Sequence, residues 1–242
     1  MSATRIRAVL FDWDGTLVDT GDLLLSCWHS TTEEVLGYRF PIEEEDRRRV
    51  LSMRGADSFP TLSDDPLVVE ALHVTFSSTY IALAPAHVTA HPHAAETLAA
   101  LAARDIRVGV VTSKTPDRRD VDGALTGLDE YIDLVITADD VSRGKPDPEG
   151  IQMALTAFGV DSTEAVYVGD GPVDVRAGRA AGVRTVGLTH GLHSRDELLD
   201  VGPDHLIDNL QELLAVVLRP DGDSHHLSGT PAAEDSSTEE HT

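Results

Sequence analysis

The sequence predicts an α/β protein, in which a parallel sheet is covered by helices and a purely helical segment is inserted after the first strand. Apolar runs alternate with helical patterns from residue 93 onward, which is typical of parallel strands joined by right-handed crossovers. In contrast, residues 20–87 follow helical spacing and contain no expected strand. Aromatic residues make up only 5% of the chain, so Val, Leu, Ala and Ile are expected to pack the core.

The first expected strand ends on two acids. The apolar run of residues 9–11 is followed by Asp12 and Asp14, and then by a Gly-Thr turn. Because ligands bind at the carboxyl ends of strands in an open parallel sheet, both acids occupy a candidate site. Alternate residues of an extended chain point to the same side, so a cation or a proton must separate the two carboxylates. The pattern suits a nucleophile beside an acid or base, or a metal site, and an ordinary turn is the alternative.

Three helices are expected in the inserted segment. Residues 24–35 follow helical spacing, and Gly37 is the expected stop. Residues 42–53 carry acids first and arginines later, which suits the helix dipole. A third helix begins at Pro66 and keeps an apolar face through Leu83. The connections to the core are expected near Thr20 and at residues 84–92.

The remaining chain alternates strands and helices up to residue 218. Beyond it, residues 219–242 are rich in Asp, Ser, Glu and His with little to bury, so a disordered acidic tail is expected. Strands are expected at residues 108–112, 134–136, 165–168, 184–186 and 205–207, and helices at 93–104, 119–125, 150–158, 173–181, 197–199 and 210–218.

Composition excludes several classes of protein. The formal net charge of −23 opposes binding to nucleic acid or to an anionic membrane, because both attract basic surfaces. With one cysteine, Cys27, the chain forms no intrachain disulfide and no cysteine-built zinc site. The first residues hold no apolar stretch of signal-peptide length, and no run of about 20 apolar residues is evident. A soluble cytoplasmic protein of undetermined oligomeric state is expected.

Two later segments offer groups that bind anions. The strand of residues 108–112 ends in Thr112 and Ser113, which bring hydroxyls and loop amides, unless Thr112 only caps the strand. Lys145 stands in a Gly-Lys-Pro-Asp-Pro segment, where a rigidly held ammonium can neutralise phosphate in so acidic a chain. An ordinary surface lysine is the alternative.

A third segment repeats the opening design. The strand of residues 165–168 is followed by Gly169 and Asp170, and Asp174 comes in the first turn of the next helix. These two acids could face one hard cation together with Asp12, and Mg²⁺ favours a few carboxylates with water and substrate oxygens. Helix capping by Asp170 is the alternative, and it explains only one of the two acids.

Taken together, these motifs carry a family resemblance over residues 6–216. The chain resembles the haloacid dehalogenase superfamily of aspartate-nucleophile hydrolases, and most of all its phosphoglycolate phosphatase and pyrophosphatase-like branch. The resemblance implies a Rossmann-like catalytic core of residues 1–18 and 88–218, and a helical cap domain of the superfamily's type I over residues 19–87. The motifs that carry it are Asp12-x-Asp14-Gly15-Thr16, Thr112, Lys145 and Gly169-Asp170-x-x-x-Asp174, in that order.

The resemblance also implies roles for individual residues. Asp12 would attack phosphorus to give an aspartyl-phosphate, and Asp14 would protonate the leaving oxygen and later deprotonate water. Thr112 and Lys145 would bind the phosphoryl oxygens. The implied metal is Mg²⁺, with Asp12, the backbone carbonyl of Asp14, Asp170 and the supporting Asp174 around it.

The acid at position 14 also distinguishes between the activities known in the superfamily. Dehalogenases of the superfamily lack an acid at this position. Phosphonoacetaldehyde hydrolases typically have Ala there; Trp13 is a point of similarity to them, but they need a lysine in the cap, and residues 19–87 contain none. The expected function is therefore a Mg²⁺-dependent phosphatase acting on a small phosphorylated metabolite, with phosphoglycolate and pyrophosphate both open. The alternatives are a sugar phosphate mutase of the β-phosphoglucomutase type and a non-catalytic binding protein on the same fold.

A few residues carry weaker expectations. Arg54 in the cap could contact substrate, or it could belong with the arginines of residues 47–49 to a solvated basic face. His93 and Asp105 stand where many relatives have Gly, which indicates local turn changes. His190 and His193 follow the fifth strand and could approach the site, although a loop histidine is usually solvated.

Overall fold

The computed structural model describes residues 5–41, 43–52 and 55–218. Its centre is a six-stranded sheet whose neighbouring strands are all parallel, in the order β5-β4-β1-β6-β7-β8. The chain starts in the middle of the sheet, builds outward to one side and then to the other, so the order reverses between β1 and β6. The strands are β1 (Ala8–Phe11), β4 (Arg107–Val111), β5 (Leu134–Ile136), β6 (Ala165–Gly169), β7 (Arg184–Leu188) and β8 (His205–Ile207).

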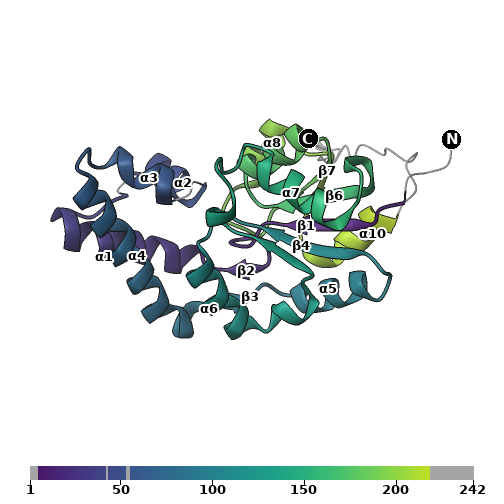
Figure 1. Ribbon diagram of the computed structural model, residues 1–242, viewed down its shortest axis with the longest axis horizontal. Helices are drawn as coiled ribbons and strands as arrows, with labels where there is room; N and C mark the ends of the chain where they lie inside the picture. Colours follow the sequence, from purple (N-terminus) through teal and green to yellow (C-terminus); the bar gives the residue numbers. More distant parts are fainter. Residues whose placement is uncertain (1–4, 42, 53–54, 219–242) are drawn as a thin grey trace, which may run out of the picture.

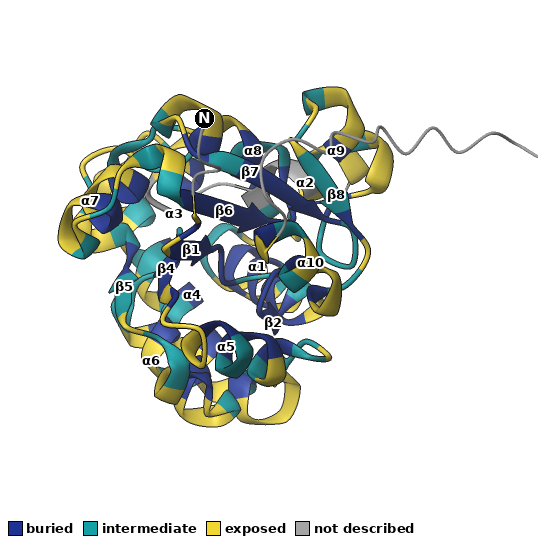
Figure 2. Cartoon of the chain, turned by 90° about the vertical axis from the view of Figure 1, so that its right-hand side faces the viewer, coloured by how far each residue is buried: buried dark blue, intermediate teal, exposed yellow. Residues whose placement is uncertain are grey.

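Helices cover both faces of this sheet (Figure 1). Alternation along β1 sends Val9 and Phe11 to one face, among α5 and α10, and Ala8 and Leu10 to the other, among α7 and α8. Because both faces are covered, the central strands are buried throughout, as Figure 2 shows for β1 and β6. The core helices are α5 (Ala94–Ala102), α6 (Pro116–Thr126), α7 (Glu149–Phe158), α8 (Pro172–Ala181), α9 (Arg195–Val201) and α10 (Leu213–Leu218).

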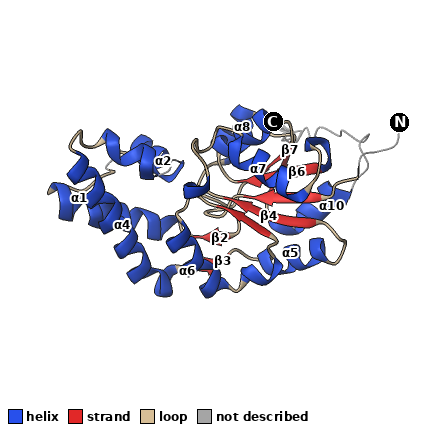
Figure 3. Cartoon of the chain, viewed as in Figure 1, coloured by secondary structure: helices blue, strands red, loops and turns tan. Residues whose placement is uncertain are grey.

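The inserted segment is a separate layer of helices beside the sheet (Figure 3). Helix α1 packs on α4 through Trp28 and Phe76, whose rings lie 5.5 Å apart, and Phe59 closes the same aromatic cluster. The helices of the insert are α1 (Gly21–Leu36), α2 (Glu44–Ser52), α3 (Gly55–Ser58) and α4 (Pro66–His87).

Both connections to the insert run through a small antiparallel ribbon that the sequence did not predict. Strand β2 (Val18–Asp19) pairs with β3 (Thr89–Ala90), so the entering and leaving chains lie side by side. Two-residue strands are too short to give a periodic signal, which is why this pairing was missed. The ribbon lies where the hinges were expected, and the domain division at residues 18 and 88 stays a prediction.

The expected elements are otherwise present, with shifted ends. Helix α6 begins at Pro116, three residues earlier than expected, and α9 extends beyond the expected residues 197–199. The last helix opens as a 3₁₀ turn at Leu210–Glu212 before α10. Gly37 ends α1 in the left-handed conformation, as the sequence predicts. The tail of residues 219–242 and the expected helix ends at residues 42 and 53 lie outside the described residues.

Helix α4 bears on the prediction that no membrane segment exists. The helix is 22 residues long and contains an 18-residue window with a mean hydropathy of 1.4, so by length and composition alone it could cross a membrane. One such helix is weak evidence, and here Leu72, Phe76 and Tyr80 are buried in the packing of the insert. Packing in the fold buries 22% of this window, whereas Leu67, Val74 and Ile81 stay exposed.

His93 and Asp105 adopt backbone conformations that favour glycine. Their φ angles are 67° and 57°, in the left-handed region. This agrees with the expectation of local turn changes at these two positions. They flank α5, and Asp105 lies just before the amino end of β4.

Candidate active site

The carboxyl ends of β1, β4 and β6 meet at one edge of the sheet. Phe11 pairs with Val110 of β4 and with Val168 of β6, so the residues that follow these strands are neighbours. Asp12 follows β1 and Asp170 follows β6, which places them where the strand order reverses. Ligands bind at this position in open α/β sheets.

Three buried carboxylates gather there. One oxygen from each of Asp12, Asp170 and Asp174 lies within 4.8 Å of the others, and all three residues are buried. Gly169 makes the cluster possible, because a Cβ at this position would lie 2.3 Å from the Cβ of Asp174. Buried like charges at this spacing repel one another, so the donor set suits a hard cation with oxygen ligands.

Lys145 supplies the positive charge on one side of the cluster. Its Nζ lies 2.7 Å from Oδ1 of Asp12 and 2.7 Å from Oδ1 of Asp174. Burial alone would lower the pKa of Lys145, but the two carboxylates hold it well above its ordinary value. Burial raises the pKa of Asp12 well above its ordinary value despite the attraction of Lys145, and the charges of Asp174 and Asp170 add to the rise. A second cation at this position would favour the ionised carboxylate.

Asp170 is held from three sides. Its Oδ1 accepts a hydrogen bond from the Thr16 hydroxyl at 2.9 Å, and its Oδ2 accepts one from the Leu192 amide at 2.6 Å. Nδ1 of His193 lies 3.8 Å from the same Oδ2. Burial would raise the pKa of Asp170, but His193 and these donors bring it below its ordinary value. Of the two alternatives for this loop histidine, the structure thus shows the approach to the site, and His193 is buried and not solvated.

Asp14 turns to a different partner, Lys114. Nζ of Lys114 lies 2.7 Å from Oδ1 of Asp14, and the Thr20 hydroxyl donates to the same oxygen at 2.6 Å. Thr20 is the residue before α1, so the insert contributes directly to the position of this carboxylate. The chain contains two lysines, and each pairs with one acid of the Asp-x-Asp motif.

Lys114 is fixed in turn by a buried polar cluster. Its ammonium lies 2.6 Å from the Tyr80 hydroxyl and also pairs with Asp122, whose side chain is fully buried. The Tyr80 hydroxyl and the Trp13 indole N–H both donate to Asp122, at 2.9 and 3.0 Å. Tyr80 belongs to α4 and Asp122 to α6, so this cluster joins the insert to the core.

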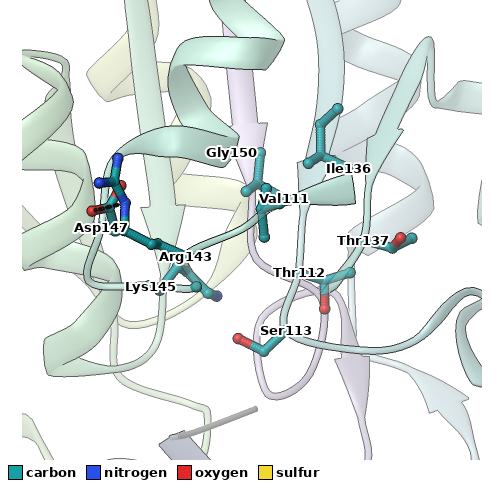
Figure 4. A pocket seen from close by; sticks show the side chains of 11 residues that line it. Val111, Thr112, Ser113, Ile136, Thr137, Arg143, Lys145, Asp147 and Gly150 are labelled. Atoms are coloured by element: carbon teal, nitrogen blue, oxygen red, sulfur yellow. Dashed lines mark ion pairs between the residues drawn. The ribbon is translucent and has the colours of Figure 1, made fainter. Parts of the chain in front are cut away.

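A cavity of about 30 Å³ opens between these groups. Asp12 and Asp14 line it from the loop that follows β1, and Lys145 lines it from the loop before α7. Figure 4 shows Lys145, Thr112 and Ser113 around an adjoining opening, with the ion pair between Arg143 and Asp147 at its edge. The residues that line the cavity are Asp12, Asp14, Leu51, Thr112, Ser113, Lys145, Asp170, Val173, Asp174, Leu192 and His193.

This geometry agrees with a comparison of the sequence with known families. The profile described as haloacid dehalogenase-like hydrolase matches residues 9–188, which span the two acidic motifs and the lysine segment. The chain belongs to the haloacid dehalogenase-like hydrolases. The expected superfamily is therefore confirmed.

Related proteins support the branch of this hydrolase family expected from the sequence. The pyrophosphatase PpaX of Bacillus pumilus is 34% identical over 221 residues, covering 90% of this chain and 99% of that protein. A haloacid dehalogenase-like hydrolase from Bacteroides fragilis is similar in structure, with a TM-score of 0.78, 28% identity, and coverage of 86% of this chain and 100% of that one. CbbY from Rhodobacter sphaeroides, solved with phosphate, gives a TM-score of 0.76 at 26% identity, over 86% of this chain and 96% of that one.

In this hydrolase, all but one of the residues expected from the sequence meet at the edge of the sheet. Asp12, Asp14, Thr112, Ser113 and Lys145 line the cavity together with both later acids. The exception, Arg54, lies outside the described residues, so its expected contact with substrate stays a prediction. Lys114, Tyr80 and Asp122 were not predicted as site residues, because their meeting depends on tertiary packing of separate elements.

Proposed function

We propose that this hydrolase is a Mg²⁺-dependent phosphatase that removes phosphate from a small phosphorylated metabolite through a phosphoryl group carried on Asp12. The observation that carries the proposal is the position of Asp12. It ends the central strand between the ammonium of Lys145 and the carboxylates of Asp170 and Asp174. A nucleophilic carboxylate needs such neighbours because it must approach an anionic phosphate.

The three clustered acids fit a divalent cation. Their oxygens converge within 4.8 Å in a buried pocket, and carboxylates are the ligands that Mg²⁺ prefers. We assign Asp12, Asp170 and the backbone carbonyl of Asp14 to the ion, with Asp174 supporting the site through its contact with Lys145. When bound, the ion would polarise the phosphoryl group and offset negative charge.

The phosphoryl oxygens need donors of their own. Lys145 supplies an ammonium, and Thr112 and Ser113 bring hydroxyl groups to the same cavity. The Lys114 amide donates to the Thr112 hydroxyl at 3.1 Å, which orients that oxygen at the end of β4. Donors fixed before the reaction stabilise the charge that develops in the transition state.

Proton transfer is assigned to Asp14. Its carboxyl lies on the insert side of the cavity, where a leaving group would depart, and Thr20 and Lys114 hold it there. In the first step Asp14 gives a proton to the leaving oxygen while the carboxylate of Asp12 forms its bond to phosphorus. In the second it takes a proton from the water that attacks this phosphorus, and Asp12 is released.

The class of substrate follows from the insert and from relatives. The insert lies over the cavity, so a small substrate is expected to be enclosed and shielded from water. One relative is named a pyrophosphatase, and a CbbY variant was solved with xylulose-(1,5)bisphosphate. Pyrophosphate and small organic phosphomonoesters are therefore the substrates to test, and a cytoplasmic location stays part of the proposal.

A phosphate-release screen tests this function. Wild-type protein is assayed on pyrophosphate, phosphoglycolate and sugar phosphates, with Mg²⁺ and with EDTA. We expect release that EDTA abolishes and that Asp12→Asn reduces by at least about 10³-fold, since no nucleophile remains. Asp105→Asn, the same exchange in an exposed turn, is the matched control and should keep full activity.

Other outcomes of the screen would contradict the proposal. Release that persists in Asp12→Asn at the wild-type rate would exclude the covalent route. Conversion of glucose 1-phosphate to glucose 6-phosphate without free phosphate would indicate a mutase. Binding without turnover on the whole panel would indicate a binding protein.

A further inference from the structure

The carboxyl of Asp14 is held through one of its two oxygens. The Thr20 hydroxyl donates to Oδ1 at 2.6 Å, and Nζ of Lys114 lies 2.7 Å from the same oxygen. Oδ2 accepts no hydrogen bond from a described residue. Asp14 lines the cavity of the reacting groups and also a second cavity, of about 50 Å³, on the insert side. Oδ2 is therefore the oxygen left to exchange a proton with a ligand, and the contacts of Oδ1 decide where it points.

The ammonium of Lys114 is itself fixed in place. An ammonium group carries three N–H groups, and side-chain oxygens of three residues surround this one. They belong to Asp14, to Asp122 and to Tyr80, whose hydroxyl accepts from Nζ at 2.6 Å. The Lys114 side chain is only 1% exposed. Any displacement of the ammonium would break a buried contact, so Lys114 holds Asp14 at one position.

Asp122 anchors this lysine from the core. Its carboxylate pairs with Lys114 and accepts hydrogen bonds from the Trp13 indole N–H at 3.0 Å and from the Tyr80 hydroxyl at 2.9 Å. The Asp122 side chain is fully buried. Trp13 stands between the two acids of the opening motif, so Asp122 is tied both to that motif and to the lysine that serves it.

Tyr80 completes the arrangement from the insert. Its hydroxyl accepts from Lys114 and donates to Asp122, which requires that it keep its proton. Burial, together with the charges of Asp14 and Asp122, raises the pKa of Tyr80, so the hydroxyl stays protonated. Tyr80 lies on α4, which packs against α6 (Figure 1). The three contacts of the ammonium therefore form only when α4 is seated on α6.

We propose that Tyr80 and Asp122 are positioning residues for proton transfer by Asp14, and that they act through Lys114. Neither residue lines either cavity, so neither contacts the substrate. The proposal rests on the proposed phosphatase function and deepens it, because it makes the proton step depend on contacts between the insert and the core.

Two small substrates separate the proton step from the other requirements of the reaction. Acetyl phosphate releases acetate, a stable anion that needs no proton, whereas the ethoxide of ethyl phosphate must be protonated as it leaves. Both substrates need the same nucleophile and the same phosphoryl donors. Asp14→Asn should therefore reduce kcat/KM for ethyl phosphate by about 10²- to 10⁴-fold, the range typical of general acid catalysis, and for acetyl phosphate far less.

Tyr80→Phe keeps the ring and removes the hydroxyl. The ammonium then loses one of its three fixed partners, so Asp14 is displaced but still present. We expect kcat/KM for ethyl phosphate to fall by about 10-fold and that for acetyl phosphate by less than about 2-fold. Asp122→Asn should separate the two substrates in the same direction, and it provides a second test should one variant fail to fold.

Tyr38→Phe is the matched control. It is the same exchange in the same insert, but the Tyr38 side chain is 47% exposed and lines neither cavity. Both kcat/KM values should stay at the wild-type level. Thermal unfolding of each variant measures stability separately, and a loss of folded protein lowers the rates on both substrates by the same factor.

Each outcome decides the matter. A selective loss on ethyl phosphate in Tyr80→Phe and Asp122→Asn, absent in Tyr38→Phe, supports the positioning role. An equal loss on both substrates in these two variants would show a structural role only, and unchanged rates would show no role; either result overturns the proposal while the proposed function stands. Asp14→Asn without a selective loss would overturn the proposal together with the proton role of Asp14. Release that persists in Asp12→Asn would instead refute the proposed function.

Discussion

Nζ of Lys114 lies 2.7 Å from Oδ1 of Asp14, in the same arrangement as Nζ of Lys145 and Oδ1 of Asp12. The two lysines of the chain thus each serve one carboxylate of the opening motif. Both ammonium groups are buried, with side-chain exposures of 1% and 6%. In a chain with net charge −23, these two positive charges stand where acids are most crowded. Replacing either lysine is therefore expected to have an unusually large effect on the stability of the fold or on activity.

Replacing Lys114 should destabilise the fold strongly. Lys114→Met leaves the fully buried carboxylate of Asp122 without its cation, and breaking a buried ion pair costs about 3–5 kcal/mol. Urea unfolding measures the loss in the free energy of unfolding. The double variant Lys114→Met/Asp122→Asn should recover part of this loss, because the uncompensated charge is gone. A double variant no more stable than the single one would contradict this account.

The presence of only two lysines makes their environments directly observable. Protein labelled with ¹³C at lysine Cε should show two resonances, which Lys145→Arg assigns. Tyr80→Phe removes the hydroxyl 2.6 Å from Nζ of Lys114 and should shift the Lys114 signal alone. Tyr131→Phe, on the 3₁₀ turn after α6, is the control and should move neither signal. Unchanged signals in Tyr80→Phe would show that α4 does not contact Lys114 in solution.

His91 should make stability dependent on pH. Its ring stacks on His190 at 4.0 Å, and its Nε2 is buried without a hydrogen-bond partner among the described residues. Burial, and then the neighbouring His190, lower the pKa of His91 from 6.5. The unfolded chain therefore binds this proton more readily, so stability falls as pH drops through about 6.5 toward the folded pKa.

Thermal unfolding between about pH 7.5 and pH 5.5, in the presence of EDTA, measures this effect. His91→Gln should lose less stability than the wild type over this interval. His87→Gln, at the exposed end of α4, should behave like the wild type. An equal slope for His91→Gln and the wild type would show that His91 does not contribute.

Much of the fold could be predicted because its signals are local. Apolar runs such as Ala165–Gly169 bounded by Gly and Asp define buried strands, and Pro66 and Gly37 mark helix ends. The β2–β3 ribbon is two residues long on each side, and its pairing joins segments about 70 residues apart. No local pattern in the sequence encodes such a contact.

The residues of the candidate site also fall into two groups, those that a local sequence pattern predicts and those that only tertiary packing brings together. Asp12 and Asp170 could be found because each lies just beyond a strand, and strand ends converge in a parallel sheet. Asp174 could be found from its place in the first turn of the following helix, and Lys145 from its Gly-Lys-Pro-Asp-Pro segment. The contacts of Lys114 with Tyr80 and Asp122 arise from the packing of α4 against α6. Each of these residues by itself has the sequence context of an ordinary helix or loop position.

The central claim is that Asp12 carries the phosphoryl group. The direct test is acid quenching during turnover of a ³²P-labelled substrate, followed by peptide mapping of the labelled protein. The account predicts label in the peptide that contains Asp12, absent in Asp12→Asn and discharged when turnover is completed. Label on any other residue, or sustained turnover with no labelled protein at any time point, would contradict it.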